Sequence, residues 1–120
     1  MNKFQEKIKK FAEERDWTQF HTHKDLLLGI VEEIGEIRNI IKWEQDIEKI
    51  KKAIDEHKEE LKDHIGDLYW FLALLANNSN IDLDEAISEV INKNELRFPI
   101  NDTKSKHTNI YLGGKDKNYN

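Results

Sequence analysis

Two groups of acidic residues recur at spacings of three and four within apolar stretches of this sequence. The first group is Glu32, Glu33 and Glu36, and the second is Glu60, Asp63 and Asp67, with His64 among them. Carboxylates placed among leucine and isoleucine on a helix are expected to be at least partly buried, and a buried carboxylate needs a cation. Two such groups that face each other would form a site for a hard divalent metal ion.

The spacing places the members of each group on one helix face. Residues three and four apart on a helix are neighbours, so Glu33 lies near Glu36, and Asp67 lies near His64. Both groups can therefore point into one groove. Mg²⁺ prefers oxygen ligands and is commonly held by a few carboxylates together with substrate phosphates, and two helices that each offer two carboxylates fit this demand.

The elements that would carry these groups are helices, because apolar residues recur at helical spacing through most of the chain. An all-α fold is therefore expected. A first amphipathic helix is predicted over residues 2–15 and a loop over 15–23, with two aromatic residues and two histidines in the loop. Thr22 is the predicted cap of a second helix that should run to about residue 42 or 43.

A third apolar stretch covers residues 46–76, with Asp46 as its predicted cap. Its segment 55–59 is wholly polar, so the stretch forms either one long helix or two. Asp82 followed by Glu85 is typical of a capping box and predicts a last helix, which should end before Pro99. Asn77 to Asn80 is predicted to be a turn.

Length and composition indicate the number of domains and exclude some binding partners. The chain has 120 residues, which favours one domain, predicted at 1–100 and followed by a polar C-terminal tail at 101–120. A net charge of −5 argues against nucleic-acid binding. There is no apolar run of membrane-spanning length and no signal-peptide pattern, so no membrane partner and a cytoplasmic location are expected.

Four motifs follow one another at characteristic distances. They are Arg15 to Thr22, Glu32 to Glu36 with the later Trp43, Gly66 to Leu72, and Asn94 to Pro99. In this order the motifs resemble the MazG-like all-α nucleoside triphosphate pyrophosphatases, and most closely their dCTP pyrophosphatase branch. The resemblance implies a four-helix bundle-like fold, assembly into a homo-dimer or homo-tetramer, and Mg²⁺-dependent hydrolysis of nucleoside triphosphates to monophosphate and pyrophosphate, a house-cleaning function for the nucleotide pool.

The resemblance also implies metal ligands at Glu33, Glu36 and Asp67, with Glu32 as the leading acid. One position departs from the family pattern, because His64 stands where a glutamate is expected. Three explanations are open. Glu60, or Asp63 beside it, could supply the missing carboxylate; His64 could itself bind a softer ion such as Mn²⁺; or the site could have lost a metal and much of its activity.

The remaining site residues implied by the resemblance would bind the nucleotide. They are Trp17, His21 and Trp43 for the base and sugar, and Asn94 and Arg97 in the segment near the phosphates; Lys93, a cation beside Asn94, is a further candidate for binding the phosphates. Glu32 or Glu36, where not committed to metal, could orient the attacking water and accept its proton. Trp70 and Phe71 are predicted to belong to the core or to a subunit interface.

Two other classes of function compete with this prediction. The chain could be a non-catalytic helical oligomerisation or interaction module that retains a degenerate metal site. A carboxylate-bridged di-iron bundle would require Glu-x-x-His on two helices, and this spacing is missing from the two helices that carry the acids.

Overall fold

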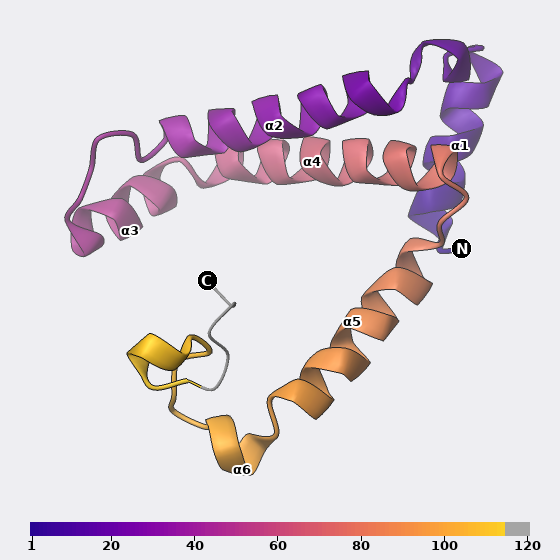
Figure 1. Cartoon of the computed structure of the whole chain (residues 1–120). Helices are drawn as coiled ribbons and strands as arrows, with labels where there is room; N and C mark the ends of the chain where they lie inside the picture. Colours follow the sequence, from indigo (N-terminus) through magenta and orange to yellow (C-terminus); the bar gives the residue numbers. More distant parts are fainter. Residues whose placement is uncertain (115–120) are drawn as a thin grey trace. The chain divides into compact units, whose positions relative to one another are not determined.

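The computed structural model describes residues 1–114, and this part of the chain is helical without a strand (Figure 1). The predicted all-α class is therefore confirmed. The elements are α1 (Lys3–Glu14), η1 (Thr18–Phe20), α2 (His23–Asn39), α3 (Ile47–Glu56), α4 (Lys58–Asn78), α5 (Leu83–Arg97), α6 (Ile100–Thr103) and η2 (Ile110–Leu112).

The chain divides into two compact units, Met1–Leu83 and Asp84–Asn120. In the first unit α2 and α4 lie side by side and run in opposite directions, α1 packs across the C-terminal end of α4, and α3 adjoins its beginning (Figure 1). The second unit contains most of α5, together with α6 and η2. The last six residues of the predicted tail lie outside the described residues.

Side-chain caps begin the helices as the sequence predicts. The backbone N–H of Asp25 donates to Thr22 Oγ1 at 3.1 Å, and that of Lys49 donates to Asp46 Oδ1 at 3.1 Å. Each bond satisfies one of the first N–H groups of a helix, which have no partner within the helix itself. The predicted caps of α2 and α3 are thus confirmed.

The ambiguous third stretch is two helices. α3 ends at Glu56, His57 leaves the helical conformation with φ −110° and ψ 28°, and α4 begins at Lys58. α2 also ends before the predicted residue 42 or 43, at Asn39, and passes through a turn in which Trp43 has a positive φ of 70°.

The predicted turn at Asn77 to Asn80 is wrong in its first half. α4 continues through Asn77 and Asn78, and only Asn80 takes the left-handed conformation. Asn favours turns because its side chain competes with the backbone for hydrogen bonds. Here both carboxamides bond to other parts of the chain instead, which removes that competition.

The hydrophobic core lies where α1, the start of α2 and the second half of α4 meet. Its buried residues are Ile8, Ala12, Leu26, Ala73 and Leu74, with Trp70 and Phe71 packed against them. The predicted packing role of Trp70 and Phe71 is confirmed. Gly29 of α2 lies against Phe71, and a Cβ at this glycine would be 2.7 Å from the ring. The absence of a side chain therefore sets how closely α2 approaches α4.

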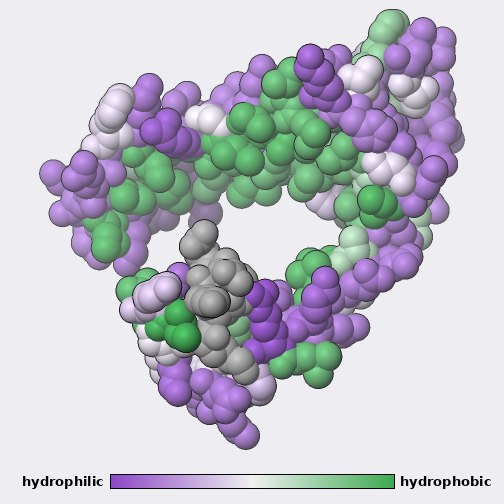
Figure 2. Space-filling view, viewed as in Figure 1, coloured by the Kyte–Doolittle hydropathy of each residue, from purple (hydrophilic) through white to green (hydrophobic). Residues whose placement is uncertain are grey.

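Beyond this core, α2 and α4 expose rows of apolar side chains, which Figure 2 shows as hydrophobic surface over both helices. We call these residues the exposed apolar face. They are Leu27, Leu28, Val31 and Ile34 of α2, and Ile65, Tyr69 and Leu72 of α4. A continuous apolar surface of this kind is unusual on a monomer. None of the helices within residues 1–114 combines the length and apolar character needed to span a membrane.

Candidate metal and nucleotide site

Three of the predicted metal ligands come together between α2 and α4. One ligand atom each from Glu33, His64 and Asp67 lies within 4.8 Å of the other two. Glu33 Oε2 is 3.1 Å from His64 Nδ1, so the two helices are joined by a direct contact between side chains 31 positions apart. Glu33 and His64 are only 14% exposed, as expected for an acid placed among apolar residues.

Two further glutamates extend this cluster. Glu36 Oε2 is 3.2 Å from His64 Nδ1, and Glu60 Oε1 is 3.7 Å from His64 Nε2. Both side chains are about half exposed, at 55% and 53%. Glu60 therefore reaches the same imidazole as the α2 acids, whereas Asp63 does not belong to the three-residue group.

The expected burial of the acids is wrong for most of them. Glu32, Asp63 and Asp67 are exposed, as are the two glutamates that flank His64. The reason is that the apolar residues around them are exposed as well, so the described residues of the first unit place no covering layer over these faces of α2 and α4.

His64 is the electrostatic centre of the cluster. Its hydrogen bond with Glu33 raises the pKa of the imidazole, the charges of Glu36 and Glu33 add to this increase, and desolvation opposes it. The protonated ring neutralises part of the charge of the acids around it. Without such a cation, neighbouring carboxylates would repel one another.

The donor set fits a divalent ion that accepts both oxygen and nitrogen. Glu33 and Asp67 offer carboxylate oxygens, and His64 offers a ring nitrogen within the same small space. Imidazole suits Mn²⁺ and the later transition metals better than Mg²⁺, which prefers an all-oxygen shell. His64 must lose its proton before it can bind any ion.

The aromatic residues predicted to bind the base differ in their surroundings. The ring of Trp17 packs edge-on against Phe11, with centroids 5.6 Å apart, and approaches His21 at 6.4 Å. Trp43 is 84% exposed and has the positive φ noted above, with Lys42 Nζ 5.4 Å from its ring centroid. An exposed tryptophan on a strained backbone is a feature that folding alone does not explain.

The loop with Trp17 and His21 is held by the end of α4. The side-chain amide of Asn78 donates to the main-chain oxygen of His21, while His21 Nδ1 is buried without a hydrogen-bond partner within residues 1–114. Sequence reasoning missed Asn78, because it treated the asparagines as a turn. Two consecutive asparagines at the end of an apolar helix are the signal that could have identified it.

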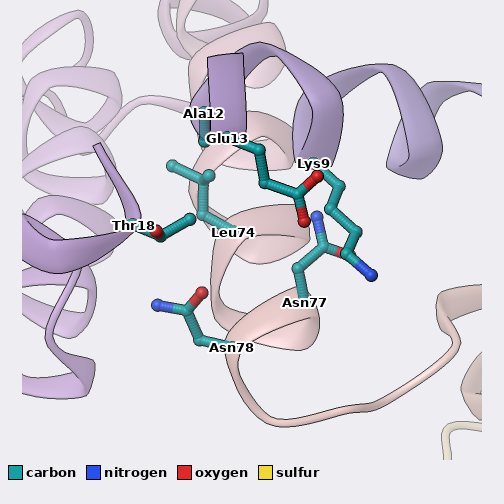
Figure 3. Close-up of a pocket in the computed structure, with 7 residues that line it drawn as sticks. All are labelled: Lys9, Ala12, Glu13, Thr18, Leu74, Asn77 and Asn78. Carbon is teal, nitrogen blue, oxygen red and sulfur yellow. The ribbon is translucent and has the colours of Figure 1, made fainter. Parts of the chain in front are cut away.

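A small pocket of about 110 Å³ lies beside this contact, between α1, η1 and α4 (Figure 3). Its lining residues are Lys9, Ala12, Glu13, Thr18, Leu74, Asn77 and Asn78. Its lining combines the apolar side chains of Ala12 and Leu74 with polar side chains from α1, η1 and α4.

The residues predicted to bind phosphates lie on α5, in the second unit. Lys93 and Arg97 are exposed, and Asn94 is half-buried. The Arg97 guanidinium carbon lies 5.2 Å from the centroid of the Phe98 ring. Their role in phosphate binding stays a prediction.

In this all-α chain a glutamate, a histidine and an aspartate gather between two antiparallel helices, an arrangement that could hold a metal ion in the way that facing helices do in helical bundles. The chain belongs to the MazG nucleotide pyrophosphohydrolase domain family, whose profile matches residues 21–100. The family predicted from the four motifs is thereby confirmed.

Individual relatives support this assignment. The chain is 31% identical to dCTP pyrophosphatase 1 of Rattus norvegicus over 112 residues, which cover 90% of the chain and 66% of the rat protein. It is 32% identical to dCTP pyrophosphatase 1 of Homo sapiens over 107 residues, covering 86% of the chain and 63% of the human protein. The chain thus spans somewhat less than two thirds of these relatives.

A solved structure shares the fold. It is a pyrophosphatase from Archaeoglobus fulgidus DSM 4304, with a TM-score of 0.71 and 26% sequence identity. The match covers 78% of this chain and 87% of the archaeal one.

Proposed function

We propose that this protein is a metal-dependent hydrolase that converts nucleoside triphosphates to the monophosphate and pyrophosphate, and that it serves to clean the nucleotide pool. The observation that carries the proposal is the cluster of Glu33, His64 and Asp67 between α2 and α4 of a MazG-family chain. The names of the rat and human relatives make dCTP the first substrate to test.

The ion would be held by Glu33, Glu36, His64 and Asp67. Glu60 would supply the carboxylate that the family pattern has at position 64. These side chains fit Mn²⁺, and they fit Mg²⁺ where Glu60 takes the place of the imidazole. The chemistry that such an ion supplies is neutralisation of charge on the phosphate oxygens.

The protein's own carboxylates would handle the water. Glu32 and Glu36 are exposed, so Glu32, or Glu36 where it does not hold the ion, would orient a water molecule and accept its proton. The anhydride bond between the α- and β-phosphates is then broken. The water oxygen forms a new P–O bond in one product, the electron pair of the broken anhydride bond leaves with the other product, and the proton of the water passes to the carboxylate, which gives monophosphate and pyrophosphate.

The residues proposed to bind the nucleotide carry aromatic rings or hydrogen-bond donors. Trp17, His21 and Trp43 offer aromatic surface for the base and sugar, and Lys93, Asn94 and Arg97 offer donors for the phosphates. The high exposure of Trp43 supports a role in stacking, because burying that ring against a base removes a large apolar surface from water.

We also propose that the active form is a homo-dimer, or a homo-tetramer made of two dimers. α2 and α4 supply only two long helices, and the exposed apolar face covers both. An apolar groove of about 480 Å³ continues beside it, lined by Phe4, Ile8, Gly66, Tyr69 and Trp70. A second copy packed on this surface would complete a four-helix bundle and would reduce the exposure of the acids.

The test is to incubate the purified protein with each ribo- and deoxynucleoside triphosphate, with Mg²⁺ and separately with Mn²⁺, and to resolve the products. Monophosphate with pyrophosphate is expected, and chelation should abolish it. Asp67→Asn should also abolish turnover while leaving the helical circular dichroism unchanged. Diphosphate with phosphate, or no turnover with either ion, would contradict the proposal.

The second candidate is a non-catalytic oligomerisation or interaction module with a degenerate metal site. His64 at a carboxylate position and the exposed apolar face favour it. Such a module would release no monophosphate and pyrophosphate with or without metal, so the same incubation separates the two functions.

A further inference from the structure

The last turn of α4 uses two neighbouring asparagines for different purposes. Asn77 Oδ1 accepts a hydrogen bond from Gln5 Nε2 at 2.9 Å, and Asn77 Nδ2 donates to the main-chain oxygen of Gln5 at 3.3 Å. Asn78 instead donates to the main-chain oxygen of His21. Figure 3 shows that the two side chains leave the helix in different directions. Asn77 therefore joins α4 to α1, and Asn78 joins α4 to the loop before α2.

That loop is organised mainly by its own short-range contacts. The N–H of Phe20 donates to the oxygen of Trp17, and the N–H of His21 donates to the oxygen of Thr18. These bonds shape the loop but do not attach it to the rest of the unit. The bond from Asn78 comes from 57 positions away, and it is followed by a second one, 3.1 Å between His23 Nε2 and Ser79 Oγ.

The ring of His21 depends on this attachment for its position. Because its Nδ1 has no hydrogen-bond partner within residues 1–114, the ring is placed by its backbone and by its contact with Trp17. A shift of the His21 main chain would therefore move the His21 ring, which is one of the three residues that the proposed function assigns to the base and sugar, and would change its contact with Trp17.

We propose that Asn78 is a positioning residue for nucleotide binding, which holds the carbonyl of His21 and so presents the ring of His21, in contact with Trp17, to the substrate. The inference rests on the proposed function. It adds to that function a residue, Asn78, that contacts the loop rather than the nucleotide. Asn77 provides a built-in comparison, because it makes tertiary hydrogen bonds from the same helical turn without reaching the loop.

The experiment compares Asn78→Leu and Asn77→Leu, which remove the carboxamide at nearly constant size, and Asn78→Gln, which keeps a donor. Steady-state kinetics should show KM raised about tenfold in Asn78→Leu with kcat changed less than about twofold, the size of effect that one lost hydrogen bond produces. Asn78→Gln should recover part of that loss. Asn77→Leu should lower Tm and leave KM unchanged.

Hydrogen exchange of residues 18–22 supplies a readout that needs no nucleotide. Exchange there should quicken in Asn78→Leu and stay as in the wild type in Asn77→Leu. Equal increases of KM in both leucine variants, or unchanged exchange in the loop, would overturn the inference while leaving the proposed function intact.

The remaining outcomes are also decisive. If the wild type neither binds nor hydrolyses any nucleoside triphosphate, the proposed function fails, and the role of Asn78 in substrate binding fails with it. If Asn78→Leu does not fold, Asn78→Ser, which is smaller and polar, takes its place with the same expected increase in KM. An unchanged KM in that variant would overturn the inference.

Discussion

His64 has two incompatible tasks in the cluster. As a protonated ring it balances the charges of Glu33 and Glu36, and as a neutral ring it can bind metal. A proton and a metal ion therefore compete for the same side chain. This competition arises because position 64 is a histidine. A glutamate there would add to the negative charge of the cluster and would favour a hard ion.

Replacing His64 by glutamate should shift the metal preference. We expect His64→Glu to bind Mg²⁺ about tenfold more tightly or better, because an all-oxygen shell suits that ion, and to lose part of its preference for Mn²⁺. Calorimetric titration of each ion into the wild type and the variant measures the change. Asp63→Asn, an exposed site outside the three-residue group, is the matched control. An Mg²⁺ affinity equal to that of the wild type would contradict this prediction.

Stability without metal should depend on the proton of His64. Its pKa is raised in the folded chain above the ordinary 6.5, so the folded state binds this proton more tightly than the unfolded state does. The resulting stabilisation is fully present below about pH 6.5 and is lost as the pH rises through the raised pKa. Thermal unfolding in chelator between pH 5.5 and 9 should show this loss for the wild type, whereas His64→Gln should lack it. Identical pH profiles for the two proteins would refute the assignment.

At the scale of elements, the distance between α2 and α4 is set by a glycine. The clash of a Cβ at position 29 with the Phe71 ring should make Gly29→Ala destabilising, because overpacking costs about 1–3 kcal/mol and exceeds the helix-propensity gain of roughly 1 kcal/mol. Chemical denaturation measures the difference, and adding Phe71→Leu should restore part of it.

Gly35 of the same helix is the control for this experiment. A Cβ there meets no atom within 4 Å, so Gly35→Ala should gain the helix propensity of alanine, about 1 kcal/mol, without a clash. Equal effects of the two substitutions would show that helix propensity, and not the approach of the helices, governs both positions.

At the scale of the whole molecule, the exposed apolar face should be covered by a second copy. Val31 is 65% exposed within that face, so Val31→Lys would place a charge in the proposed interface. We expect this variant to be a monomer in light scattering and to lose nucleotide hydrolysis. Leu96→Lys on α5, where the leucine is 84% exposed, should leave the assembly unchanged. A wild-type protein that is monomeric at micromolar concentration would contradict the proposal.

What the sequence determined by itself is local. The caps at Thr22 and Asp46 were predictable because donor and acceptor lie three residues apart, and the helices were predictable from their apolar period. The motif order was sufficient to predict the family, since it depends on residue types and distances along the chain. The same short-range reasoning could not decide between one helix and two over residues 46–76, because a polar segment is compatible with both.

What only the tertiary structure decided is which side chains meet across helices. It joined Glu33 to His64, brought Glu60 to the same ring, and left Asp63 outside the three-residue group. It also kept Asn77 and Asn78 helical by giving their carboxamides distant partners. The physical reason is that these contacts link positions far apart in the chain. They depend on how α1, α2 and α4 pack and on what covers these helices, and the apolar period of each helix does not specify that packing.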